Sequence, residues 1–117
     1  MPSFPQSARL SRPDHYRRVF EKPAFKVSSA GFLLLAQCTD SGSSRIGIIV
    51  AKKHVNRATR RNRIKRLVRE HFRLNKLTPD LDLVVLVHSA ANDMDNAQIM
   101  SDLEHLWCAL QRKASLT

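Results

Sequence analysis

The amino-acid sequence predicts a small α+β domain, an α/β sandwich with the element order α-β-β-β-α-β-α. Its 117 residues have the length of one domain. Apolar runs of strand length alternate along the chain with segments in which apolar residues recur at helical spacing. We therefore expect one folded domain over residues 11–113, an extended arm over 1–10 and a short tail over 114–117.

A short helix and two strands form the first part of the predicted fold. Ser11 is the expected N-cap of the helix, which runs to about Lys22 because Pro23 stops it. Residues 25–27 have the composition of a short edge strand, and the apolar residues 32–38 predict a second strand.

A β-branched strand and an amphipathic helix form the centre of the chain. Residues 46–51 predict a central strand, in which Gly47 indicates a bulge or a close backbone approach. The helix is expected over about 58–76, and His71 in this helix is expected to pack in the core. Its apolar stripe consists of Ile64, Leu67, Val68, His71 and Phe72.

A strand and a second long helix complete the predicted fold. The continuous apolar run 83–87 predicts a strand that is buried on both faces. The last helix is expected to open near Asp95, with Gln98 in the position of a capping box. Leu103 and Trp107 belong to its buried stripe.

Membrane and secreted proteins are excluded by composition. The longest apolar stretch, residues 30–36, is far shorter than the ~20 residues of a membrane-spanning helix. The first five residues lack the charged start and apolar core of a secretory signal. Cys38 and Cys108 give no disulfide framework. We expect a cytoplasmic protein with reduced thiols.

The positive charge is concentrated in one segment. The chain carries a net charge of +10. Residues 52–76 contain eleven cations and a single acid, Glu70, and the other 92 residues balance nine cations against nine acids. A neutral domain with one basic element has the electrostatic pattern of a polyanion binder.

The predicted basic helix favours a phosphate-bearing partner. A solvated helix face usually mixes charge signs, whereas like charges at helical spacing repel one another. The planar guanidinium of arginine suits phosphate. An anionic membrane would require an apolar face free to enter lipid, but the sheet needs that stripe. The sequence has no helix-turn-helix, zinc ligands or heptads that would indicate a DNA-binding protein.

No catalytic residue and no metal site are predicted in the protein itself. The close acid pairs Asp80/Asp82 and Asp93/Asp95 fall at the ends of elements, where turns and caps explain them. The five histidines share no metal spacing, and the two cysteines form no Cys-x-x-Cys motif. His54 follows Lys53 and is a candidate contact to a nucleic acid.

One motif is specific to a family. The strand Ile46-Gly47-Ile48-Ile49-Val50-Ala51 ends in Lys52-Lys53, and a short connector leads to Arg61-Asn62-Arg63-Ile64-Lys65-Arg66-Leu67. This pattern strongly resembles the bacterial ribonuclease P protein subunit. The resemblance extends from about Leu10 to Trp107.

The resemblance implies a fold and a function. The sheet would be mixed and four-stranded, with a left-handed crossover through the basic helix. The chain would be the protein subunit of ribonuclease P, whose catalytic RNA removes the 5′ leader of precursor tRNA. The protein would bind both the catalytic RNA and the leader. Magnesium or another divalent metal would be bound mainly by the RNA, with no organic cofactor and no obligate protein partner.

The resemblance also assigns residues. Tyr16 and Phe20, on one face of the first helix, would line the leader cleft, since single-stranded RNA stacks on aromatic side chains. From the residues alone, burial in the core is the favoured explanation of both, and the resemblance shifts the balance toward the cleft, more for Tyr16 than for Phe20. The chain departs from some relatives at Leu35, where they have a cleft tyrosine, and at His88-Ser89, where they are often basic. The expected RNA contacts are Lys52, Lys53, Arg57, Arg60, Arg61, Asn62, Arg63, Lys65, Arg66, Arg69 and Arg73.

Two other functions stay open at this point. A structural RNA-binding protein, such as a ribosomal component, would use the basic segment and would need no leader cleft. A nuclease in its own right would depend on Asp80 or Asp82.

Overall fold

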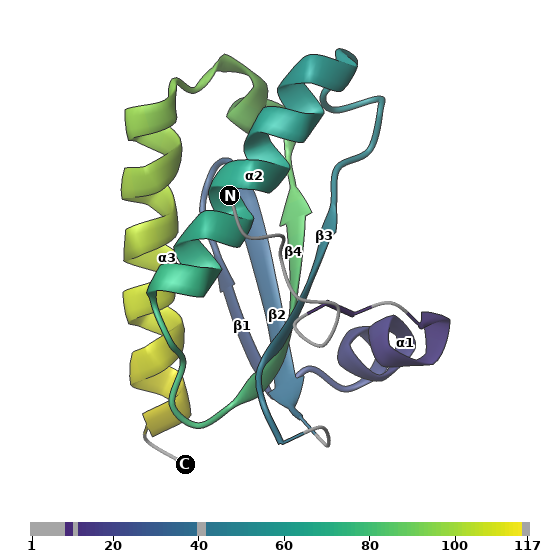
Figure 1. The fold of residues 1–117 in the computed structure, drawn as a ribbon, viewed down its shortest axis with the longest axis vertical. Coiled ribbons are helices and arrows are strands. Elements are labelled where there is room, and N and C mark those ends of the chain that lie inside the picture. Colours follow the sequence, from purple (N-terminus) through teal and green to yellow (C-terminus); the bar gives the residue numbers. More distant parts are fainter. Residues whose placement is uncertain (1–8, 11, 40–41, 116–117) are drawn as a thin grey trace.

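The structure is a computed structural model of the chain and describes residues 9–10, 12–39 and 42–115 (Figure 1). It confirms the predicted α+β class and the predicted order of helices and strands, with a short 3₁₀ helix added. The elements are α1 (Pro13–Glu21), β1 (Phe25–Ser28), β2 (Phe32–Cys38), β3 (Arg45–Ile49), α2 (Ala58–Leu74), β4 (Leu81–Val87), η2 (Ser89–Asp93) and α3 (Asn96–Ser115).

The four strands form one mixed sheet in the order β1-β2-β4-β3. β1 pairs antiparallel with β2, and β2 pairs antiparallel with β4. β3 and β4 are parallel, so the chain must cross from one end of the sheet to the other between them, and α2 lies in that crossover (Figure 1). β3 lies at the edge of this order, so the prediction of a central strand over residues 46–51 was wrong. The basic helix connects the edge strand β3 to the internal strand β4.

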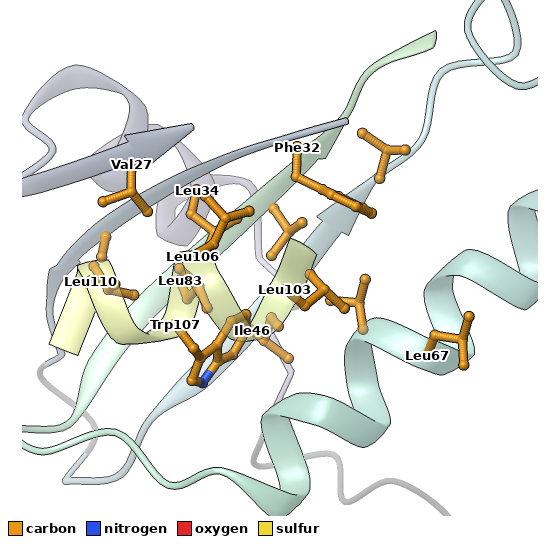
Figure 2. Packing of buried hydrophobic residues seen from close by; sticks show 14 of the residues in the cluster. Val27, Phe32, Leu34, Ile46, Leu67, Leu83, Leu103, Leu106, Trp107 and Leu110 are labelled. Atoms are coloured by element: carbon orange, nitrogen blue, oxygen red, sulfur yellow. The ribbon is translucent and has the colours of Figure 1, made fainter. Parts of the chain in front are cut away.

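The main core lies between one face of the sheet and the helices α2 and α3 (Figure 2). Phe32 and Leu83 of the sheet, Ile64 of α2 and Leu103 of α3 have no solvent exposure. His71 is only 5% exposed, and the edge of one ring meets the face of the other between His71 and Trp107, with centroids 4.7 Å apart. The prediction of a core histidine is confirmed.

Some predicted element ends were wrong. The N-cap of α1 is Arg12 rather than Ser11, and Ser11 itself lies outside the described residues. β3 begins one residue before the predicted strand and β4 begins at Leu81, because the charged residues at their starts pair inside the sheet. α2 ends at Leu74, since the Asn75 side-chain amide donates to the His71 carbonyl at 2.9 Å.

Both ends of the described chain pack against the fold. Of the predicted arm, residues 1–8 lie outside the described residues, but Arg9 bridges to Ile46 and the Leu10 amide donates to the Ile46 carbonyl at 3.0 Å. α3 continues past the predicted end of the domain to Ser115, and Ala114 is buried. Residues 116–117, the rest of the predicted tail, are also outside the described part.

The start of α3 matches its prediction. The Gln98 backbone amide donates to the Asp95 carboxylate at 2.8 Å, and the Asp95 backbone amide donates to the Gln98 side-chain oxygen at 2.8 Å. The two bonds form a reciprocal capping box. Cys38 and Cys108 are both unpaired and exposed. No helix within the described residues is long and apolar enough to cross a membrane.

Candidate nucleic-acid interface

The second face of the sheet carries α1 and presents three rows of side chains across β2, β4 and β3. The strand register defines them, because residues of one row are direct neighbours in adjacent strands. We call them the polar row, the middle row and the open row. The polar row is Gln37, Asp82 and Arg45; the middle row is Leu35, Val84 and Gly47; the open row is Leu33, Leu86 and Ile49.

α1 covers the polar and middle rows. Val19 of α1 has no solvent exposure and packs in one cluster with Leu35 and Val84. Tyr16 packs against the same cluster and lies directly over Gly47, where an added Cβ would overlap the phenol ring and its hydroxyl. The expectation for Gly47 is thus resolved as a close approach by a side chain, and the pairing of β3 with β4 continues through it without a bulge.

The open row forms a partly exposed apolar strip beside Tyr16. Leu33, Leu86 and Ile49 pack against the α1 cluster but are only partly buried. From Ile49 the chain leads into the connector that carries Lys52 and Lys53, whose side chains are exposed. An aromatic ring and an apolar strip thus lie beside each other on this face, and two exposed cations follow the strip along the chain.

The two predicted aromatic residues differ in their environment. Phe20 is 42% exposed, so it is not a core residue. Tyr16 is half-buried, with one side of its ring on Gly47. Both aromatic side chains of α1 therefore reach the surface in some part, as stacking on a base requires.

Tyr16 lies next to a cation of α2. Burial raises the pKa of the Tyr16 phenol, and the nearby charge of Arg69 opposes that rise. Burial and then the charge of Arg9 lower the pKa of Arg69, which still leaves it protonated at neutral pH. Arg9 of the arm, Tyr16 of α1 and Arg69 of α2 are thus near enough to one another for their charges to interact. The helix α2 therefore borders the surface that Tyr16 forms on α1.

The remaining cations of α2 face solvent. Arg66 and Arg73 are exposed and Lys65 is half-buried, and the predicted contacts Asn62 of the same helix and Arg57 at its N-cap are exposed as well. No ion pair found among the described residues involves a cation of α2. The repulsion between these like charges is therefore not relieved by internal carboxylates.

Three arginines in the first half of α2 also bond to neighbouring backbone. Arg61 donates to the Val55 carbonyl at 3.0 Å and to the Asn56 carbonyl at 3.1 Å. Arg63 donates to the Met94 carbonyl at 3.2 Å, and Arg60 donates to the carbonyl of Asn92. Each of these bonds uses a single terminal nitrogen, and a guanidinium has five N–H donors. These residues can therefore hold the connector and η2 against α2 and still meet a phosphate.

The first turn of α2 adds to the attraction for anions. It contains no acidic residue, and no side chain caps it. The unpaired N–H groups and the dipole give this end of a helix a partial positive charge. Cations there destabilise the free protein slightly, whereas a phosphate placed there is stabilised.

The prediction that Asp82 lies in a turn or a cap was wrong. Asp82 lies within β4 and has no solvent exposure. Its two oxygens accept bonds from Arg45 at 2.9 and 2.7 Å. A carboxylate held this way is not available to bind a metal or to activate a nucleophile. Asp80 accepts a bond from the Ser44 hydroxyl at 3.2 Å, in keeping with the predicted turn.

The described residues contain no cluster of histidine, cysteine and acidic side chains that could hold a metal ion. His54, a candidate contact, has its Nδ1 atom 2.9 Å from the Ser89 hydroxyl. The open row was missed altogether, because a continuous apolar run does not reveal which residues share a face with α1.

Comparison with known proteins shows to which family the chain belongs. The family model for ribonuclease P matches residues 4–111. The chain belongs to the ribonuclease P protein family. The ribonuclease P protein component of Marinobacter nauticus is 42% identical over 95% of this chain and 84% of its own. That of Thioalkalivibrio sulfidiphilus is 47% identical over 92% of this chain and 89% of its own.

Solved structures agree with this assignment. The Staphylococcus aureus RNase P protein has a TM-score of 0.80 at 29% identity, with 87% of this chain and 94% of that chain covered. A mutant of the S. aureus protein with defective mRNA degradation activity gives 0.81 at 30% identity, with 89% and 88% covered. The Thermotoga maritima protein gives 0.74 at 29% identity, with 89% and 96% covered.

These matches settle the function at the level of the complex. The chain is a protein component of ribonuclease P, an endoribonuclease ribonucleoprotein that acts in tRNA processing. Proteins of this kind work with an RNA subunit. The sequence prediction of a ribonuclease P protein is confirmed.

Proposed function

We propose that this chain binds the catalytic RNA of ribonuclease P through α2 and its connector, and the 5′ leader of precursor tRNA through Tyr16, Phe20 and the open row. The observation that carries the proposal is the place of Tyr16, which packs over Gly47 beside the open row and lies within reach of the charge of Arg69 on the basic helix. One protein surface can then reach an RNA backbone and single-stranded bases together.

The basic residues of α2 and its connector suit a folded RNA. Arginine forks bind phosphate oxygens in a fixed geometry, and the helix presents them from a rigid backbone. The proposed contacts are Lys52, Lys53, Arg57, Arg60, Arg61, Asn62, Arg63, Lys65, Arg66, Arg69 and Arg73.

The surface over the sheet suits a single strand. Stacking of a base on an aromatic side chain contributes about 1–3 kcal/mol. Leu35 lies in the middle row under α1 and is buried, so no stacking residue is available at that position. The stacking contacts are therefore assigned to Tyr16 and Phe20, and the open row supplies apolar contacts to the strand.

The protein contributes binding and orientation, and the RNA contributes the chemistry. Because the described residues hold no ligand cluster, we assign the divalent metal, magnesium, to the RNA and give the protein no catalytic residue. We further propose that the folded unit includes Arg9 and Leu10, which pair to its edge, and continues to Ser115 at the end of α3, and that the protein acts in the cytoplasm.

Cleavage of a precursor tRNA at low magnesium tests the proposal. Catalytic RNA alone, this protein alone and both together are compared on a substrate with a 5′ extension. Cleavage at the mature 5′ end only when both are present is the expected result. Tight binding of the catalytic RNA without any stimulation of cleavage would reduce the protein to a structural RNA binder.

The reaction that contains the protein alone tests a separate point. One structural neighbour is a mutant with defective mRNA degradation activity, which concerns cutting of RNA other than precursor tRNA. Cleavage of RNA by this chain without the RNA subunit, lost on substitution of Asp80, would contradict the assignment of all chemistry to the RNA.

A further inference from the structure

The polar row contains a buried ion pair that α1 joins from above. Asp82 is fully buried and Arg45 is 8% exposed. Arg45 donates to the carboxylate through Nε at 2.9 Å and through Nη2 at 2.7 Å, a bidentate pair. The charge of Asp82 is thus already balanced within the sheet.

Arg18 of α1 makes a second connection to this pair. Its Nη2 donates to the same carboxylate at 3.0 Å and to the Cys38 carbonyl at 2.5 Å. These acceptors lie at the start of β4 and at the end of β2. Since Arg45 already neutralises Asp82, Arg18 is not needed to balance the buried charge. What it adds is a link between a helix and two strands.

Other contacts bind α1 to the same end of the sheet. The His15 ring nitrogen Nε2 lies 3.3 Å from Arg45 Nη1, and the Gln37 side chain donates to the Lys22 carbonyl at the end of α1. Figure 1 shows α1 beside the end of the sheet where β4 begins, well apart from α3. The polar contacts of α1 thus gather at the polar row, one row away from Gly47.

The position of Tyr16 depends on this attachment. Tyr16 lies two residues before Arg18, and Gly47 lies two residues after Arg45 on the same face of β3. The phenol fits over Gly47 so closely that even a Cβ would overlap it. A small shift of α1 along the sheet would therefore move the ring off its seat, while the apolar packing of Val19 tolerates sliding better than a directed hydrogen bond does.

We propose that Arg18 is a positioning residue for leader binding: through Asp82 and the Cys38 carbonyl it fixes α1 on the sheet and so holds Tyr16 over Gly47. The inference rests on the proposed function, because Tyr16 matters here as a contact to the leader. Arg18 itself touches no RNA in this scheme.

Arg18→Met is the test, with Arg17→Met as its matched control. Both variants remove one arginine from α1, and Arg17 is exposed at the neighbouring position. The readout is the ratio of holoenzyme affinities for precursor tRNA and for mature tRNA without a leader. Arg18→Met should lower this leader preference by about fivefold or more, the worth of one weakly stacked base. Arg17→Met should leave the ratio unchanged.

A spectroscopic readout separates positioning from unfolding. The chain has one tyrosine and one tryptophan. Fluorotyrosine then gives a single ¹⁹F signal from Tyr16, and fluorotryptophan a single signal from Trp107 in the main core. Arg18→Met should shift or broaden the Tyr16 signal and leave the Trp107 signal as in the wild type.

The outcomes are distinct. A wild-type leader preference together with a wild-type Tyr16 signal in Arg18→Met overturns the proposal. A wild-type holoenzyme that shows no leader preference refutes the proposed function instead. If Arg18→Met also moves the Trp107 signal, Arg18→Lys replaces it: an ammonium lacks the planar fork, so a smaller change in the same direction is expected. The absence of any change in Arg18→Lys then overturns the proposal.

Discussion

Gly47 offers the most direct perturbation of the proposed leader contact at Tyr16, because the atoms nearest to an added methyl group there all belong to Tyr16. In Gly47→Ala the new Cβ would overlap the hydroxyl, one ring edge and the ring carbon between them. These atoms form the far end of a side chain that can rotate, so we expect the ring to leave and β3 to stay. Overpacking of this kind costs about 1–3 kcal/mol of stability, which a folded domain tolerates.

The loss of binding follows from the value of one stacked base. About 1–3 kcal/mol corresponds to an affinity about 5–150-fold weaker. The assay measures the dissociation constants of the reconstituted holoenzyme for precursor tRNA and for mature tRNA. We expect Gly47→Ala to weaken binding of the precursor by a factor in this range and to leave binding of mature tRNA unchanged.

Gly31→Ala is the matched control. Its Cβ would come within 3.0 and 3.2 Å of the Met94 side chain, which packs against the main core. It therefore adds a methyl group at a tight site that does not touch Tyr16. The leader preference should survive this substitution.

A double-mutant cycle completes the test. If Gly47→Ala acts by displacing the phenol, it should have no further effect on leader binding in a Tyr16→Ala background. A full additional loss in that background, or a wild-type leader preference in Gly47→Ala, would refute the placement of the leader over Tyr16.

Three further outcomes are expected. If about six cations of α2 and its connector meet phosphates, the logarithm of affinity for the catalytic RNA should fall against the logarithm of salt concentration with a slope of about −4 to −5; a flat response in filter binding would contradict this. Burial lowers the pKa of His71, so as the pH falls this side chain is protonated in the unfolded chain before it is protonated in the folded one. The free energy of unfolding measured in urea should therefore fall as the pH drops below about 6.5 and level off below the pKa of the folded state. His71→Leu should remove this part of the pH dependence. Asp82→Ala leaves Arg45 buried without its carboxylate and should cost about 3–5 kcal/mol in urea unfolding, so a loss well under 1 kcal/mol would show that the pair does not secure the sheet.

The pattern of apolar residues was sufficient to predict the elements, but not their ends. β2 was predicted with its exact bounds, since its apolar run is continuous. β4 was predicted too short, because Asp82 interrupts the apolar pattern close to its start. A charge within a strand is explained only by its partner across the sheet, and sequence alone does not supply the register.

The candidate site divides in the same way. The basic helix follows from charge counting, which needs no coordinates. The open row depends on which alternate residues of three strands share a face, and Arg45 and Gly47 reveal this only through their contacts with α1. The backbone bonds of Arg60, Arg61 and Arg63 were equally hidden, because the residue type suits a carbonyl as well as a phosphate.

The partly exposed open row also bears on how the free protein behaves in solution. An apolar strip on a sheet invites contact with the same strip of another copy. A net charge of +10 opposes such an encounter, since two copies repel each other. Salt screens that repulsion, and so does a bound polyanion. Colloidal stability of the protein without RNA should therefore decline as ionic strength rises. A leader bound as proposed would cover the strip under the same conditions in which bound RNA neutralises the charge, and would so prevent self-association.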